Sequence, residues 1–136
     1  MNVESFTLSD HAEDNHGKLS IMGVFDQVDS QTFPAQHPHC CLALRLRFQR
    51  SEEGTHKVRI VLVDADGKQG AFKFEGEVKN PAPLSYDTWA ANLVINMNGL
   101  PIPAPGNLYW DLVVDGQLVS RLPLYARQVG KQQAAA

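Results

Sequence analysis

The chain has 136 residues, of which 43% are hydrophobic and 20% are charged, and its formal net charge is -3. This length fits one domain of about 100 to 150 residues, and this composition excludes a disordered chain, which would be less hydrophobic and more highly charged. The negative net charge gives no whole-protein electrostatic basis for binding nucleic acid or an anionic membrane, so we expect neither partner.

The first ten residues contain no basic segment followed by an apolar stretch, so we expect neither a signal peptide nor a membrane-spanning segment there. The two cysteines, Cys40 and Cys41, are adjacent. Adjacency strains a disulfide between them and leaves no other cysteine for pairing. Reduced thiols in a reducing compartment are the simplest interpretation, and we expect a cytoplasmic protein.

Alternation of apolar and polar residues with a period of two dominates the sequence and predicts strands rather than helices. The predicted strands span residues 3–10, 19–26, 41–49, 56–64, 71–78, 88–97, 108–114 and 118–125. Residues 11–18, 31–39 and 80–87 are predicted connections, and the proline-rich segment 99–106 is predicted to run in a polyproline-like course. We therefore predict an all-β, single-domain antiparallel β-sandwich of about eight strands over residues 1–129, followed by a frayed tail at 130–136.

The alternation also assigns one face of most of the predicted strands to the core. In the hairpin around Gly67, pairing Ile60 with Phe74 and Leu62 with Phe72 keeps core residues opposite each other. The same register places Arg59 opposite Glu75, which supports it independently. The predicted core residues are Leu42, Leu44, Leu46, Phe48, Val58, Ile60, Leu62, Phe72, Phe74, Trp89, Ala91, Leu93, Ile95, Met97, Leu108, Trp110, Leu112 and Val114.

The last hairpin turns at Asp115 and Gly116. A two-residue turn would pair Trp110 with Arg121 and mix the two faces. A three-residue loop would pair Trp110 with Leu122, and we prefer it because it keeps apolar residues together.

Potential metal ligands cluster in the segment 37–41, which reads His-Pro-His-Cys-Cys. Imidazole nitrogens and thiolates are the ligands that zinc and copper use. Alternation points Cys40 toward the core and leaves His39 and Cys41 on the outer face. His37, His39 and Cys41 are therefore candidate metal ligands, and two loop histidines beside one buried cysteine are the alternative interpretation. No other cofactor is expected.

Four basic residues form a second candidate site: Arg45, Arg47, Lys57 and Arg59. If their two strands are neighbours, the four side chains form one outward strip that binds a small anionic ligand or an acidic partner. The alternative is a solvated face on which glutamates neutralise half of the strip.

The sequence contains none of the common catalytic or phosphate-binding motifs, so we expect no enzyme. Our leading hypothesis is a non-catalytic β-sandwich module for interaction with a protein partner or for scaffolding. Self-association through a sheet face is part of this hypothesis, because Val61, Val63, Val94 and Val113 fall on outward faces.

Several short motifs along most of the chain carry a family resemblance. They are Asp10, Gly17-Lys18-Leu19, Gly23-x-Phe25-Asp26, Phe33-Pro34, Gly106-x-x-Tyr109-Trp110, Val114-Asp115-Gly116 and Pro123-Leu124. This combination resembles a family of small bacterial proteins known only as a domain of unknown function. The resemblance implies a cytoplasmic β-sandwich of immunoglobulin-like or related type, with no assigned activity and no catalytic residue.

Overall fold

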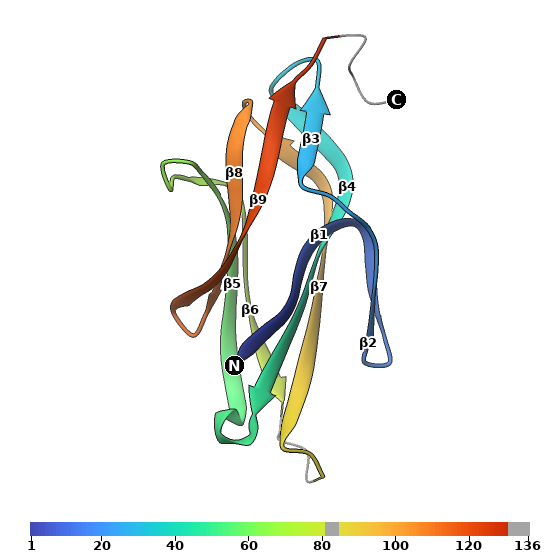
Figure 1. Cartoon of the computed structure of the whole chain (residues 1–136). Coiled ribbons are helices and arrows are strands. Elements are labelled where there is room, and N and C mark those ends of the chain that lie inside the picture. Colours follow the sequence, from blue (N-terminus) through green and yellow to red (C-terminus); the bar gives the residue numbers. More distant parts are fainter. Residues whose placement is uncertain (81–84, 131–136) are drawn as a thin grey trace.

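The computed structural model describes residues 1–80 and 85–130, which form two β-sheets packed face to face (Figure 1). The prediction of a single all-β sandwich is confirmed. Residues 131–136 of the predicted tail, and residues 81–84 of the predicted connection 80–87, lie outside the described residues. No helix in the described part of the chain is long and apolar enough to cross a membrane.

The described residues form nine strands and one short 3-10 turn. They are β1 (Asn2–Asn15), β2 (Lys18–Val24), β3 (Gln27–Ser30), β4 (Ala35–Gln49), η1 (Arg50–Glu52), β5 (Gly54–Asp64), β6 (Gln69–Asn80), β7 (Thr88–Ile102), β8 (Gly106–Val114) and β9 (Gln117–Gln128). The first sheet has the strand order β2-β1-β4-β7, and the second has the order β3-β9-β8-β5-β6. The unpredicted strand β3 pairs with β9 in parallel, whereas the other neighbours are antiparallel.

The core lies between the two sheets, where Trp110 and Phe48 are the largest fully buried side chains. Most of the predicted core residues are buried there. The exceptions are only half-buried and pack at its margin: Phe72, Phe74, Leu93, Ile95 and Leu108. The alternation therefore predicted the inner faces correctly.

The hairpin between β5 and β6 has the predicted register as far as Val61, but the expected pairing of Leu62 with Phe72 is wrong, because a bulge shifts the register and Val63 pairs with Gln69. Ile60 pairs with Phe74 and Arg59 pairs with Glu75, and Arg59 Nε lies 3.6 Å from Glu75 Oε1. Around Gly67 the turn is closed by the Asp64 carboxylate, which accepts hydrogen bonds from backbone N–H groups of the turn. This bonding gives Asp64 a structural role in the hairpin.

The three-residue loop predicted between β8 and β9 is wrong. Asp115 and Gly116 form a two-residue turn with positive φ values of 51° and 82°, as this tight hairpin turn requires. A register shift beyond Leu112 adds one residue to β9, and this bulge restores the predicted pairing of Trp110 with Leu122.

Two predicted connections are also strands. β7 continues through the proline-rich segment to Ile102, and Leu100 and Ile102 are buried. The strand tolerates Pro101 because β7 lies at the edge of its sheet, where a missing N–H need not cost a ladder hydrogen bond. Similarly, β4 begins at Ala35, within the predicted connection 31–39.

The predicted connection 11–18 is instead a β1–β2 hairpin that folds over the outer face of the first sheet. Its turn is at His16 and Gly17, and its inner side chains pack on Cys41, Ala43 and Val94. The hairpin lies to the right of β1 in Figure 1. Residues 11–18 show little apolar alternation because Ala12 is the only buried residue among them.

Candidate functional site

The structure brings together two of the three predicted metal ligands. His39 and Cys41 project from the outer face of β4, and Cys41 Sγ lies 3.7 Å from His39 Nε2. The ring of His37 instead packs against Phe25, with 5.1 Å between the ring centroids. Within residues 1–80 and 85–130 no three or more His, Cys, Asp or Glu side chains converge in a metal-binding arrangement.

Two asparagines of the neighbouring strand β7 complete the surroundings of this pair. Cys41 Sγ donates a hydrogen bond to Asn96 Oδ1 at 3.0 Å, and His39 Nδ1 lies 2.8 Å from Asn98 Oδ1. The antiparallel register explains these contacts, because it places Asn96 opposite Cys41 and Asn98 opposite His39. The alternate asparagines of the β7 sequence were the available signal, but their partner strand could not be predicted.

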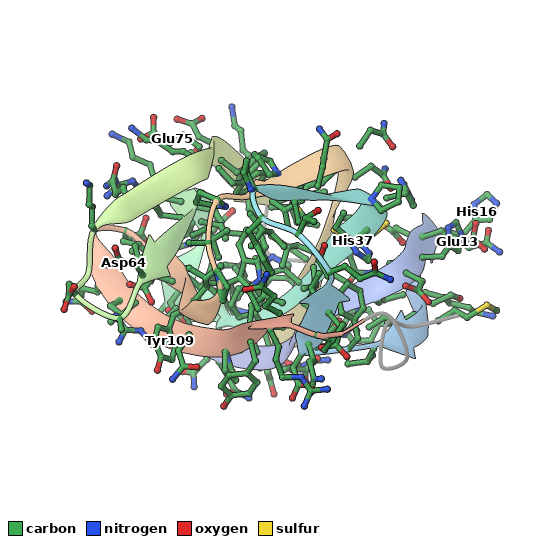
Figure 2. All side chains as sticks on the ribbon, turned by 90° about the horizontal axis from the view of Figure 1, so that it is seen from above. Glu13, His16, His37, Asp64, Glu75 and Tyr109 are labelled. Atoms are coloured by element: carbon green, nitrogen blue, oxygen red, sulfur yellow. The ribbon has the colours of Figure 1, made fainter. Side chains whose placement is uncertain are left out.

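Polar side chains at the tip of the β1–β2 hairpin lie apart from this cluster. Glu13 and His16 project away from the body of the molecule, on the side opposite Asp64 (Figure 2). His11 Nε2 is 4.0 Å from Glu13 Oε2, and both side chains are exposed. These residues form a solvated hairpin tip.

The predicted basic strip of Arg45, Arg47, Lys57 and Arg59 does not form. β4 belongs to the first sheet and β5 to the second, so the two pairs of side chains lie on opposite outer faces of the sandwich. The sequence cannot show this, because strands adjacent along the chain can join different sheets.

Arg45 and Arg47 are both engaged by Glu4 of β1. Arg45 Nε donates to Glu4 Oε1 at 2.9 Å, and Arg47 Nε donates to Glu4 Oε2 at 2.5 Å. The hydrogen bond from Arg47 lowers the pKa of the Glu4 carboxyl. The two guanidinium groups of β4 therefore link this strand to β1 through Glu4.

Lys57 and Arg59 line an open groove of about 550 Å³ on the outer face of the second sheet. Glu75 and Glu77 of β6 line the same groove. Glu75 lies at the outer surface of this sheet in Figure 2. The groove thus presents two cations and two carboxylates, and this balance gives it little net attraction for an anion.

A different feature is an unpaired strand edge on β1. β2 pairs with β1 only from Ser9 onward, so in the described structure no strand pairs with the side of residues 3–8 that faces away from β4. We call this side the β1 edge. Leu8 C=O points outward here, because it accepts the Phe25 N–H at 3.0 Å. Alternate residues of a strand present their backbone groups to the same side, so the Phe6 N–H and C=O point outward as well.

An apolar groove of about 360 Å³ runs along the β1 edge. On its far side lies β9, which runs beside β1 (Figure 1). We call this space the apolar groove. The hydrophobic residues that line it are Phe6, Leu8, Val24, Phe25, Leu122 and Pro123.

Sequence reasoning missed the β1 edge because its availability depends on where β2 leaves β1. β2 pairs with β1 as far as Val24. The preceding residue is Gly23, which has φ at +75° and where a Cβ would lie 2.6 Å from Asp10 Oδ2. The sequence predicts a bulge or close backbone approach at Gly23, and the structure confirms it.

Comparison with known families supports the predicted membership in a family of unknown function. No curated protein matches the chain. A family model matches residues 4–127, which span most of the described sandwich, and the protein therefore belongs to the family of unknown function DUF6941.

Proposed function

We propose that the protein is a binding module that takes up an extended, apolar segment of a partner protein along the β1 edge. The observation that carries this proposal is the outward backbone of Phe6, which in the described part of the chain has no strand partner on the β1 edge and lies beside the apolar groove. An added strand would pair with the outward Phe6 N–H and C=O, and its alternate side chains would enter the groove.

The exposure of one lining side chain supports this location. Val24 of β2 lines the apolar groove and is 64% exposed. A large apolar side chain that stays exposed beside an apolar groove is typical of an interaction surface.

Association through the outer valines has less support. Val61 and Val63 are buried within the chain, and Val94 is packed beneath the β1–β2 hairpin. Because these side chains are already covered, a second copy would gain little by packing on them. The β1 edge is the better candidate for an interface.

The test begins with a phage-displayed library of random nine-residue peptides selected on the purified protein. We expect apolar, strand-forming peptides, whose binding slows hydrogen exchange of the Phe6 amide. Val24→Lys places a charge in the apolar groove and should weaken binding by about tenfold or more. Met22→Lys is the matched control, because Met22 is equally exposed on the same strand but does not line the groove.

Equal binding by both variants, or a Phe6 amide that exchanges at the same rate with and without peptide, would reject the proposal. Light scattering of the free protein adds a second outcome. A dimer that protects the Phe6 amide would show that the occupant of the β1 edge is a second copy and not another protein.

A further inference from the structure

The two adjacent cysteines occupy opposite faces of β4. Cys40 is part of the core between the sheets, where burial raises the pKa of its thiol to about 11. Cys41 lies on the outer face, beneath the β1–β2 hairpin, in contact with His39 and Asn96. Cys40 therefore lies in an apolar environment, whereas its sequence neighbour Cys41 lies beside a basic imidazole and an amide.

The contacts of His39 define how it faces Cys41. Nδ1 must carry the proton if it donates to Asn98 Oδ1, so the neutral ring keeps an unprotonated Nε2. This nitrogen faces Cys41 Sγ at 3.7 Å. A thiol, a base within reach of it and a third group that orients the base make up the usual arrangement of an activated cysteine.

The cover over Cys41 is thin. The side chain has no exposed surface, and the residues packed over it include Ala12, Leu19 and Ile21 of the β1–β2 hairpin. No residue of β2 is fully buried, and Asn92 Nδ2 holds the hairpin turn through a 3.1 Å hydrogen bond to Gly17 C=O. Elements with few buried contacts open locally without unfolding of the whole domain.

We propose that Cys41 is a peroxide-reactive thiol for which His39 acts as the base. The Cys41 S–H, which is directed at Asn96 Oδ1 in the structure, first rotates toward His39 Nε2. The proton then moves to His39 Nε2, and the sulfur attacks one oxygen of hydrogen peroxide. The O–O bond breaks as the S–O bond forms, and the departing hydroxide takes the proton from His39 to leave as water. Sulfur is oxidised to the sulfenic acid, and the peroxide is reduced.

The reactant must be small, because the thiol lies under the hairpin. The product is not expected to form a disulfide within the chain, since Cys40 points to the opposite face of the strand. The sulfenic acid therefore remains available to a small external thiol. The sulfur of that thiol displaces water and forms a mixed disulfide, which can be reduced.

The experiment exposes the native protein to hydrogen peroxide, then unfolds it in urea that contains iodoacetamide to alkylate the remaining thiols, and localises oxidation by peptide fragmentation. We expect Cys41 to be oxidised while Cys40 stays reduced. The exposed Met22 reports the peroxide dose in every sample. Oxidation of both cysteines at one rate, or of neither, would overturn the proposal.

Variants test the base. His39→Gln should slow oxidation of Cys41 by about tenfold or more. His37→Gln is the matched control and should leave the rate unchanged, because this histidine packs on Phe25 instead. Equal rates in the two variants would refute the role of His39.

Two further variants keep the test independent of any effect of His39→Gln on folding. Asn98→Ala leaves the thiol and imidazole in place but removes the group that orients the ring, so it should slow the reaction by less than His39→Gln. Asn92→Ala releases the hairpin turn and should speed oxidation of Cys41 without oxidising Cys40. An unchanged rate in both variants would contradict the proposed arrangement.

Discussion

The two sheets cover the apolar side chains of their outer faces in different ways. On the first sheet, Cys41, Ala43 and Val94 are covered by a separate layer, the β1–β2 hairpin. On the second sheet, Val61 and Val63 lie on the interior strand β5 and are covered without any added layer.

The neighbours of these two valines explain their burial. Val61 lies between Asp111 of β8 and Lys73 of β6, and Val63 pairs with Tyr109. Long side chains on flanking strands shield small ones on a central strand, because only their polar ends need to reach water. An outward valine therefore indicates an additional layer in one sheet but not in the other.

The largest expected effect is on the free energy of unfolding, and it compares the hairpin-covered face of the first sheet with the outer face of the second. Ala43→Asp places an unpaired charge beneath the hairpin and should lower the free energy of unfolding by about 3 to 5 kcal/mol. Val113→Asp, on the open outer face of the second sheet, lies opposite Arg59 and should cost about 1 kcal/mol or less. Urea denaturation measures both, and equal losses would mean that the hairpin does not seal the first sheet.

A smaller effect tests the hairpin itself. Ile21→Ala removes an apolar side chain that packs on the covered cluster and should cost about 1 to 2 kcal/mol, since Ile21 is only half-buried. Met22→Ala changes an exposed neighbour on the same strand and should leave the unfolding free energy nearly unchanged. A loss in Met22→Ala as large as that in Ile21→Ala would contradict the packing described here.

The inner faces of the sandwich could be predicted from the sequence because side-chain direction in a strand depends only on a period of two. The pairing of Ile60 with Phe74 could be predicted too, since apolar residues opposite each other and opposite charges beside them favour one register, although the bulge between this pair and the turn could not. Both features depend on residues that are close together along the chain.

The sheet to which each strand belongs could not be predicted in this way. Arg47 and Lys57 are close in sequence but lie in different sheets, whereas His39 and Asn98 are far apart but adjacent in space. The β1 edge could not be predicted either, because it exists only along the part of β1 with which β2 does not pair. Such features depend on long-range pairing, which alternation within one strand does not encode.

The smallest expected effect concerns a contact that the two sheets share. His56 of β5 stacks on Phe48 of β4, with 4.3 Å between the ring centroids. Its Nδ1 lies 2.7 Å from Asp115 Oδ2, and its Nε2 lies 2.5 Å from Glu52 C=O. Because both nitrogens face oxygen acceptors, only the protonated ring can donate to both. Burial opposes protonation, but the hydrogen bonds to Asp115 and Glu52 outweigh it and raise the pKa of His56.

A raised pKa means that the folded protein binds the His56 proton more tightly than the unfolded chain does. This stabilisation is complete below the unfolded pKa of about 6.5 and is lost as the pH rises through the folded pKa. The Asp115 carboxyl, although its burial favours the neutral form, has a pKa lowered mainly by His56. Its contribution is therefore lost only in more acidic solution.

Urea denaturation should accordingly give a higher free energy of unfolding at about pH 5.5 than at about pH 8.5. His56→Gln should flatten this dependence, because the amide does not titrate. His11→Gln, on the exposed hairpin, should retain it. A dependence of the opposite sign, or one that survives in His56→Gln, would show that another group controls the stability of the contact between the two sheets.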